Sequence, residues 1–362
     1  MQKVMMAITT LGGGGAERVV SVWANQLKHT GYEVSLLLFC RIEQEYPIDP
    51  DVTVYTVAST NKEYVSLSYF ERLKRMRGIL KTVRPDVLIN FLPPVQIWMM
   101  VASWGMNVRR IETVRNNPWV SCHGMEKILW KRCFSRSNVV IVQTAEQAEF
   151  FKKKIQQRCV VIPNPIEERY CDHPKTEYAD RVTRFVAAGR LDEQKNYAVM
   201  IEAFKRACDR CASISLDIYG AGGDAYRSEI QKKIDDLKLS DQVRLKGRTA
   251  DMSSVYREAD AFLMTSDFEG MPNALAEAMV SGLVCVSTNC RTGPRDMIEH
   301  EESGFLVKVG DASEIARAIV KVAGMSREQC EKMGSNARER ILSLCGEENS
   351  LRQLIQVIEG QN

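Results

Sequence analysis

Short runs of apolar residues alternate with amphipathic stretches along most of the chain. In the first half this pattern predicts strands at residues 4–9, 34–39, 52–57, 87–91, 110–113, 139–143 and 160–162. Helical periodicity lies between these runs, for example at residues 16–28 and 69–82. Continuous apolar strands separated by helices are typical of a parallel sheet covered on both faces. The first half is therefore predicted to be a doubly wound α/β domain.

The pattern stops near the middle of the chain and then starts again. Pro-Asn-Pro at 163–165 ends the first half, and a polar segment follows to about residue 183. New apolar runs predict strands at residues 185–188, 214–219, 243–246, 261–265, 284–287 and 305–307. We therefore predict an α/β fold of two doubly wound Rossmann-like domains facing each other across a cleft. Their expected bounds are 1–165 and 184–346, with a linker at 166–183.

Length and charge agree with this division. A chain of 362 residues suits two domains, and 45% hydrophobic with 26% charged residues is ordinary for a soluble globular protein. Residues 1–165 hold 22 Lys and Arg against 13 Asp and Glu, whereas the remainder holds 27 against 33. A basic first half suggests an anionic partner there, such as membrane lipid or a phosphate-bearing acceptor. An uneven solvated surface accounts for the charge equally well.

Cysteine usage and hydropathy indicate the compartment. The cysteines number eleven, and Cys208 and Cys211 form the only Cys-x-x-Cys, without a second pair of ligands. We predict no metal site, and so many free thiols fit a reducing cytosol. No apolar run reaches the ~20 residues that span a bilayer. The protein is expected to be cytoplasmic, either soluble or peripheral on the inner face of the cell membrane.

Glu269 and Glu277 stand eight apart in the stretch Asp-Phe-Glu-Gly-Met-Pro-Asn-Ala-Leu-Ala-Glu. The predicted strand 261–265 leads into this loop, and Pro272 and Asn273 favour a helix start there. Backbone N–H groups at a helix start suit a phosphate or polar sugar hydroxyls. The two carboxylates could hold two ends of one extended ligand. Either one alone is read more readily as an ordinary surface carboxylate.

Other candidates follow strand ends. Arg190 and Lys195 lie just beyond strand 185–188, where fixed positive charge could stabilise a departing nucleoside diphosphate; a solvated basic loop is the alternative. Glycines at 12–15 and 220–223 would let the backbone approach a ligand. Glu17 breaks the Gly-x-Gly-x-x-Gly spacing, and no Walker spacing is present. Arg248 could lie beside a base or ribose, or belong to a capping turn.

These segments together resemble the family-4 retaining glycosyltransferases, which have the two-domain glycosyltransferase B (GT-B) fold. The resemblance rests on Glu-x7-Glu at 269–277, Gly-Arg-Leu-x3-Lys-Asn at 189–196, and residues 281–287, 293–298 and 303–307. It is strong over residues 185–310 and looser over the first 45 residues and 87–165. It also suggests that a C-terminal helix at 347–362 packs back on the N-terminal domain.

The resemblance assigns roles to individual residues. Arg190, Lys195 and Glu269 are the expected catalytic residues: the two cations bind the pyrophosphate and Glu269 contacts the donor sugar. Glu277 is expected on the nucleotide ribose. The donor-binding set is completed by Gly14, Gly15, Gly220, Gly222, Arg248, Gly270, Met271, Pro272, Asn273, Ala274 and Leu275.

The N-terminal domain departs from the family pattern. Many relatives place a histidine after a strand that faces the donor sugar, but this sequence has Arg-Asn-Asn-Pro at that point. We expect Arg115 and Asn116 to contact the acceptor or the donor sugar. The chain has only four histidines, and His123 follows the strand by about ten residues. The sequence therefore identifies no catalytic histidine.

The implied activity is transfer of a hexosyl or N-acetylhexosaminyl group from a nucleotide sugar to a saccharide acceptor. We expect a UDP-sugar donor and an acceptor on a polyprenyl lipid, in bacterial cell-surface polysaccharide such as capsule or O-antigen. Neither a cofactor, a metal nor nucleic acid is implied. Basic amphipathic segments at 69–81 and 125–136 suit an anionic membrane or a solvated basic face. A nucleotide-sugar epimerase and a non-catalytic nucleotide-sugar-binding scaffold remain alternatives.

Overall fold

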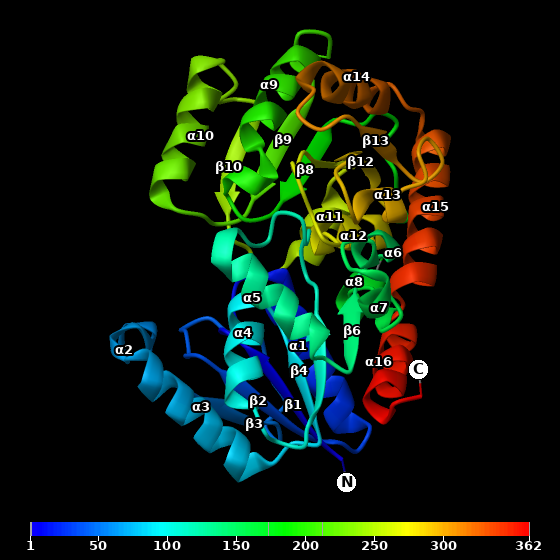
Figure 1. The fold of residues 1–362 in the computed structure, drawn as a ribbon. Helices are drawn as coiled ribbons and strands as arrows, with labels where there is room; N and C mark the ends of the chain where they lie inside the picture. Colours follow the sequence, from blue (N-terminus) through cyan, green and yellow to red (C-terminus); the bar gives the residue numbers. More distant parts are fainter. Residues whose placement is uncertain (1, 173, 212, 362) are drawn as a thin grey trace. The chain divides into compact units, whose positions relative to one another are not determined.

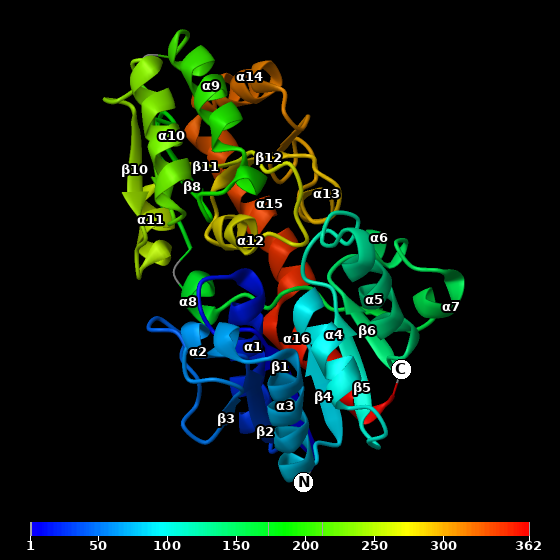
Figure 2. The same ribbon diagram turned by 60° about the vertical axis from the view of Figure 1, so that its left-hand side comes forward.

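The computed structural model describes residues 2–172, 174–211 and 213–361. The chain divides into two compact units. The N-terminal unit comprises Met1–Pro165 with Glu347–Asn362, and the C-terminal unit comprises Ile166–Gly346. Each unit is an α/β structure with a central sheet (Figure 1, Figure 2).

The N-terminal unit contains a seven-stranded sheet in the order β3-β2-β1-β4-β5-β6-β7. All neighbouring strands are parallel, so the predicted doubly wound class is confirmed here. The strands are β1 (Lys3–Ile8), β2 (Glu33–Leu38), β3 (Thr53–Thr56), β4 (Val87–Asn90), β5 (Arg109–Thr113), β6 (Val139–Val142) and β7 (Cys159–Val161).

Helices cover both faces of this sheet because β1 is apolar on both sides. Met6 packs with α1 and α16, whereas its neighbours Met5 and Ala7 pack with α3 and α4 on the opposite face. The helices are α1 (Gly15–His29), α2 (Asn61–Ser66), α3 (Tyr69–Val83), α4 (Pro93–Ala102), α5 (Gly124–Ser135), α6 (Ala145–Ala148), α7 (Lys153–Gln156) and α16 (Glu347–Glu359).

The C-terminal helix α16 is part of the core of the N-terminal unit. Leu354, Val357 and Ile358 are buried in the same apolar cluster as α1. Trp23 Nε1 on α1 donates a hydrogen bond to Ser350 Oγ at 3.3 Å. The last turns of the chain therefore complete one face of the first sheet.

The C-terminal unit contains a six-stranded parallel sheet in the order β10-β9-β8-β11-β12-β13. Its strands are β8 (Arg184–Ala188), β9 (Ser215–Tyr219), β10 (Val243–Gly247), β11 (Ala261–Met264), β12 (Val284–Thr288) and β13 (Phe305–Val307). Its helices are α8 (Glu168–Cys171), the short 3-10 helix η1 (Glu193–Lys195), α9 (Tyr197–Cys208), α10 (Asp224–Asp236), α11 (Met252–Glu258), α12 (Asn273–Val280), α13 (Pro294–Met297), α14 (Ala312–Ala323) and α15 (Arg327–Cys345).

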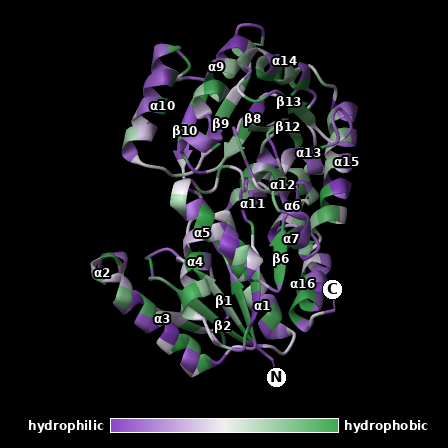
Figure 3. Ribbon diagram, viewed as in Figure 1, coloured by the Kyte–Doolittle hydropathy of each residue, from purple (hydrophilic) through white to green (hydrophobic). Residues whose placement is uncertain are grey.

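The second sheet is also covered on both faces. Phe185 and Ala187 of β8 pack toward α9 and α14, and Val186 packs toward α11, α12 and α15. Within each unit the apolar colouring concentrates on the strands and the polar colouring on the outer faces of the helices (Figure 3). Residues 166–183 belong to this unit, where Tyr178 Oη donates to the carbonyl of Gly282 at 2.8 Å.

No helix in the described part of the chain combines the length and the apolar character needed to cross a bilayer.

Candidate functional site

Three loops meet at the carboxyl edge of the second sheet. They follow β8 (residues 189–196), β11 (residues 265–272) and β12 (residues 289–293). Because β11 lies between β8 and β12 and all three strands are parallel, their following loops are neighbours. This edge is where doubly wound sheets bind ligands.

Lys195 and Glu269 are in direct contact within these loops. Lys195 Nζ lies 2.6 Å from Glu269 Oε1, and the two side chains are only 15% and 7% exposed. Gln194 Nε2 donates to the other carboxylate oxygen at 3.3 Å and to the carbonyl of Phe268 at 2.8 Å. Both oxygens of Glu269 are therefore held by hydrogen-bond donors.

The loop after β8 is fastened to the loop after β11 along its length. Thr265 Oγ1 donates to the carbonyl of Lys195 at 3.1 Å, and the Asp267 N–H donates to the carbonyl of Gln194 at 2.9 Å. Asn196 has a φ of 49°, and its side chain accepts from Val199 N at 3.2 Å, which caps α9. Its Nδ2 also donates to Asp267 Oδ1 at 2.8 Å. These hydrogen bonds fix the backbone position of Lys195.

A third loop holds the backbone of Glu269. Thr292 Oγ1 donates to the Glu269 carbonyl. Gly293 follows with a φ of 79°, and a Cβ there would overlap the carbonyl oxygen of Gly270. Only glycine fits this position, because both the conformation and the space exclude a side chain.

Glu277 lies on α12, just beyond its first turn. It is buried, and Tyr256 Oη donates to its Oε2 at 3.3 Å. Tyr256 is itself fully buried on α11. Pro272 is the N-cap of α12, and Gly270, Met271 and Pro272 are buried ahead of it. Asn273, Ala274 and Leu275 form the first turn, whose N–H groups have no acceptor within the helix.

Arg190 lies apart from the Lys195–Glu269 pair. Its side chain is 61% exposed, and its Nη2 lies 3.3 Å from Asp192 Oδ2. The glycines after β9 pack against this same loop: a Cβ on Gly220 would overlap Gly189, and one on Gly222 would overlap Leu191. Arg248 is exposed directly after β10.

In the N-terminal unit, Gly14 is the N-cap of α1 and Gly15 its first residue. Arg115 follows β5, and its guanidinium lies over Trp23 (4.4 Å to the ring centre) and Phe91 (5.2 Å). Its Nη1 donates to Asn164 Oδ1 at 3.1 Å, while Nε and Nη2 have no hydrogen-bond partner among the described residues. Burial lowers the pKa of Arg115 to about 9.

Asn116 and His123 have local roles. Asn116 Oδ1 accepts from the N–H of Asn117 at 2.7 Å. His123 is exposed and is the N-cap residue of α5. The structure therefore places Arg115, but not His123, among buried aromatic side chains.

Glu112 is a buried acid that the sequence pattern did not single out. It lies on β5 beside Asn90, whose Nδ2 donates to its Oε1 at 3.0 Å. Gln96 continues the network by donating to the Thr113 carbonyl at 2.8 Å and accepting from Trp130 Nε1. Burial raises the pKa of Glu112 to about 8. The strand reads Arg-Arg-Ile-Glu-Thr, so no hydrophobic pattern marked this acid as buried.

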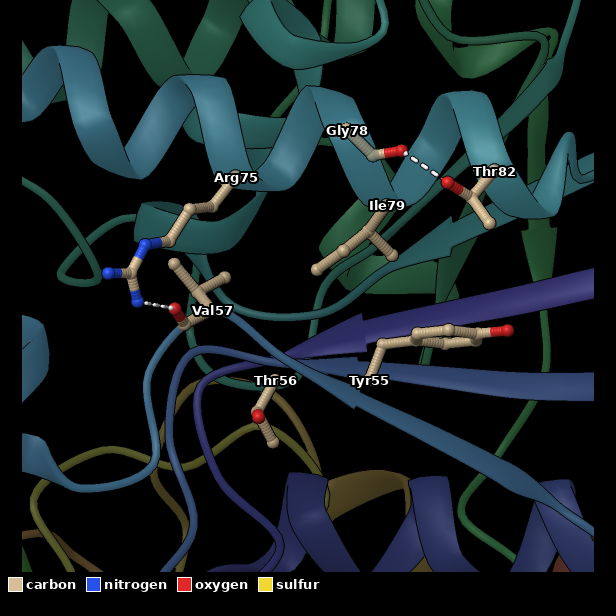
Figure 4. Close-up of a pocket in the computed structure, with 7 residues that line it drawn as sticks. All are labelled: Tyr55, Thr56, Val57, Arg75, Gly78, Ile79 and Thr82. Atoms are coloured by element: carbon tan, nitrogen blue, oxygen red, sulfur yellow. Dashed lines mark hydrogen bonds between the residues drawn. The ribbon is translucent and has the colours of Figure 1, made fainter.

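A separate hollow of about 380 Å³ lies between β3 and α3. Figure 4 shows its lining residues, which are Tyr55, Thr56, Val57, Arg75, Gly78, Ile79 and Thr82. Arg75 Nη1 donates to the Val57 carbonyl at 2.9 Å and lies 2.8 Å from Glu63 Oε1. No residue that we predicted to bind donor or acceptor lines this hollow.

The described residues include no group of three or more His, Cys, Asp or Glu side chains placed to hold a metal ion. Cys208 and Cys211 are both free thiols.

Known proteins share this architecture. Residues 13–170 match the family model for Glycosyltransferase Family 4, and residues 172–340 match that for Glycosyl transferases group 1. A mutant of TarM from S. aureus, solved in complex with Fondaparinux, alpha-GlcNAc-glycerol and UDP, superposes with a TM-score of 0.80 at 15% identity, covering 99% of this chain and 100% of TarM. Anabaena HepE, solved with UDP and glucose, gives 0.83 at 16% identity, covering 99% and 100%.

Several relatives have names that state a transfer reaction. The Campylobacter jejuni GalNAc-alpha-(1->4)-GalNAc-alpha-(1->3)-diNAcBac-PP-undecaprenol alpha-1,4-N-acetyl-D-galactosaminyltransferase is 24% identical over 344 residues, which cover 94% of each chain. Fold and family matches together define a glycosyltransferase of the GT-B fold. The two family models span most of the sequence, and the chain belongs to the family-4 glycosyltransferases.

Proposed function

We propose that this glycosyltransferase is a retaining enzyme that moves a hexosyl or N-acetylhexosaminyl group from a nucleotide sugar to a lipid-linked saccharide. The observation that carries the proposal is the largely buried Lys195–Glu269 pair at the carboxyl edge of the second sheet, with Glu277 on the adjoining helix. It combines a cation for a diphosphate with carboxylates that accept hydrogen bonds from hydroxyl groups.

The donor binds the C-terminal unit. Lys195 and Arg190 contact the diphosphate, Glu269 accepts from a sugar hydroxyl, and Glu277 accepts from the ribose. The first turn of α12 adds N–H groups that suit the phosphates or the sugar. The remaining donor contacts come from the backbone of the loops that contain Gly14, Gly15, Gly220, Gly222 and residues 270–275, and from Arg248. UDP is the proposed nucleotide, since TarM and HepE were both solved with UDP.

The reaction exchanges one bond at the anomeric carbon for another. The acceptor hydroxyl attacks from the face that the diphosphate leaves, so the configuration is retained. The carbon–oxygen bond to the β-phosphate breaks, and the hydroxyl proton passes to the departing phosphate oxygen. Lys195 and Arg190 stabilise the negative charge that develops on the leaving group, and a divalent metal ion is not required.

The N-terminal unit binds the acceptor, with Arg115 and Asn116 contacting the acceptor or the transferred sugar. A polyprenyl-diphosphate saccharide is the proposed acceptor, supported by the undecaprenol-linked substrate in the name of the Campylobacter relative. Such transfer would contribute to capsule, O-antigen or another cell-surface glycan, at the cytoplasmic face of the membrane.

Surface chemistry supports membrane docking by the N-terminal unit. In the described part of the chain, the large apolar side chains that are exposed all lie in this unit. Phe70 at the start of α3 and Met125 on α5 are among them, at 75% and 70% exposure. The same two helices carry exposed cations, including Lys74 and Lys131. Exposed aromatic and apolar groups beside cations favour an anionic membrane surface.

The test starts with the purified protein and a panel of UDP-, GDP-, ADP- and CMP-sugars, with and without EDTA. We expect thermal stabilisation by one nucleotide class, unaffected by EDTA and lost in Lys195→Ala and Glu277→Ala. Transfer to a polyprenyl-diphosphate saccharide, with an α-configured product from an α-configured donor, would support the full proposal. Donor interconversion without an acceptor would favour an epimerase, and binding without chemistry would favour a scaffold.

A further inference from the structure

The Glu269 carboxylate is the counter-ion of the lysine that we place on the donor diphosphate. Lys195 Nζ and Glu269 Oε1 lie 2.6 Å apart, and both side chains are largely withdrawn from solvent. An anion that approaches Lys195 therefore meets a neutral pair rather than a free cation. Water and salt screen a buried pair much less than a surface pair. The carboxylate charge therefore strongly reduces the attraction of Lys195 for a second anion.

We propose that Glu269 competes with the donor diphosphate for the Lys195 ammonium, so that diphosphate binding weakens the ion pair and releases a Glu269 oxygen toward the sugar. This inference rests on the proposed function and deepens it. Glu269 then has two roles: it weakens diphosphate binding, and it contacts the sugar. Arrival of the phosphate and exposure of the sugar-binding carboxylate then become one coupled event.

The surrounding contacts allow Lys195 to change partner while Glu269 stays in place. Gln194 Nε2 holds Oε2, the oxygen that Lys195 does not contact, at 3.3 Å. Thr292 holds the backbone carbonyl of Glu269. The carboxylate would thus keep its position when the ammonium turns toward a phosphate, and Oε1 would become available to a sugar hydroxyl.

The competition is electrostatic rather than steric. An ammonium has three N–H donors, and Glu269 occupies one of them in this structure. A phosphate can approach the other two, but the ammonium that it meets is already neutralised by the carboxylate charge. Removing that charge while keeping the side-chain shape should therefore strengthen diphosphate binding, although it removes a proposed donor-sugar contact.

Calorimetric titration of the full chain with UDP, GDP, ADP and inorganic pyrophosphate provides the test. We expect Glu269→Gln to bind the cognate diphosphate about tenfold more tightly than the wild type. In a Lys195→Met background the same substitution should change the dissociation constant by less than about twofold, since the coupling runs through the ammonium. Glu202→Gln, which removes an exposed carboxylate paired with Arg206, is the matched control and should leave binding unchanged.

Each outcome decides a different point. Wild-type binding with equal or weaker binding by Glu269→Gln would overturn the competition but leave the proposed function standing. A gain that persists without Lys195 would also overturn it, because the charge would then act elsewhere. A folded wild type that binds none of the four probes would remove the proposed function itself. Should Glu269→Gln not fold, Glu269→Asp retracts the carboxylate from Lys195 and should give a smaller gain.

Discussion

Tyr256 Oη donates a hydrogen bond to Glu277 Oε2 at 3.3 Å from a fully buried position on α11. The tyrosine therefore orients a carboxylate that we propose to bind the ribose. Tyr256→Phe removes one hydroxyl and little volume, so the core should remain packed. We expect UDP to bind about fivefold more weakly to this variant.

The measurement is the dissociation constant of UDP beside the melting temperature of the variant. Tyr219→Phe is a matched control, because Tyr219 ends β9 in the same unit and is partly exposed. Its UDP affinity should not change. Equal loss of affinity in both variants, or a large fall in melting temperature for Tyr256→Phe alone, would contradict the orienting role.

Gln194 is a positioning residue for Glu269, because it donates to one carboxylate oxygen at 3.3 Å and to the Phe268 carbonyl at 2.8 Å. Gln194→Ala frees the carboxylate to rotate, which should affect the reacting sugar more than overall donor binding. We expect kcat to fall about tenfold with KM for the donor changed less than about twofold.

Steady-state kinetics of Gln194→Ala and Gln194→Glu would check this prediction. The Glu variant keeps the length but cannot donate in its charged form, so it should not restore kcat. Gln231→Ala on α10 removes an exposed glutamine that bonds to Asp235 and should leave both constants unchanged. A rise in KM with normal kcat would assign Gln194 to ground-state donor binding instead.

Two glycines give opposite predictions for the same substitution. Gly293→Ala places a Cβ against the carbonyl of Gly270 at a φ of 79°, so the variant should lose more than about 1 kcal/mol of unfolding free energy. Gly78 lies within α3, and a Cβ there would meet nothing within 4 Å. Gly78→Ala should therefore gain about 0.5–1 kcal/mol, since alanine is the better helix former. Urea unfolding of both variants compares them directly.

The pattern of apolar runs predicts the strands of both sheets close to their observed positions. Predicted strand 185–188 corresponds to β8 (Arg184–Ala188), and predicted strand 87–91 to β4 (Val87–Asn90). Apolar runs bounded by polar turns are sufficient for this, because strands buried on both faces carry few polar residues. Apolar runs do not determine the order of the strands in the sheet. Lys195 lies beside Glu269 because β8 and β11 are neighbours in the sheet.

The supporting contacts could not be predicted for the same reason. Gln194 and Glu269 are 75 positions apart, and Tyr256 and Glu277 are 21 apart on different helices. Glutamine and tyrosine are common on loops and helices, so neither stood out in a single sequence. Glu112 lies within the predicted strand 110–113, but the sequence does not say which face of the sheet its side chain occupies.

Glu112 should make folding stability depend on pH. Burial raises its pKa to about 8, whereas an unfolded glutamate titrates near 4.3, so the folded state binds the proton more tightly. Any stabilisation from this group is complete below about pH 4 and is lost as pH rises to about 8. Glu112→Gln stays neutral, so its unfolding free energy relative to wild type should increase between pH 5 and pH 8.

Urea unfolding of wild type and Glu112→Gln across that pH range measures the difference. The prediction concerns how the difference in unfolding free energy changes with pH. Its absolute size is not informative, because glutamine also changes the hydrogen bond with Asn90. Glu126→Gln on the exposed side of α5 is the control and should show no such slope. A flat difference for Glu112→Gln would mean that the acid is ionised in the folded protein.

Phe70 should contribute directly to membrane binding. It is 75% exposed at the start of α3, and its neighbour Tyr69 stacks on Trp98 with ring centres 5.8 Å apart. Phe70→Ser removes an exposed ring without opening a core cavity, so the melting temperature should not fall. Burial of a phenylalanine side chain in a membrane interface contributes about 1.5–3 kcal/mol, and we expect at least tenfold weaker binding to vesicles rich in anionic lipid. Val161→Ser is the matched control, because Val161 is an exposed apolar residue of the edge strand β7. Equal weakening of vesicle binding by both substitutions would argue against a docking surface on α3.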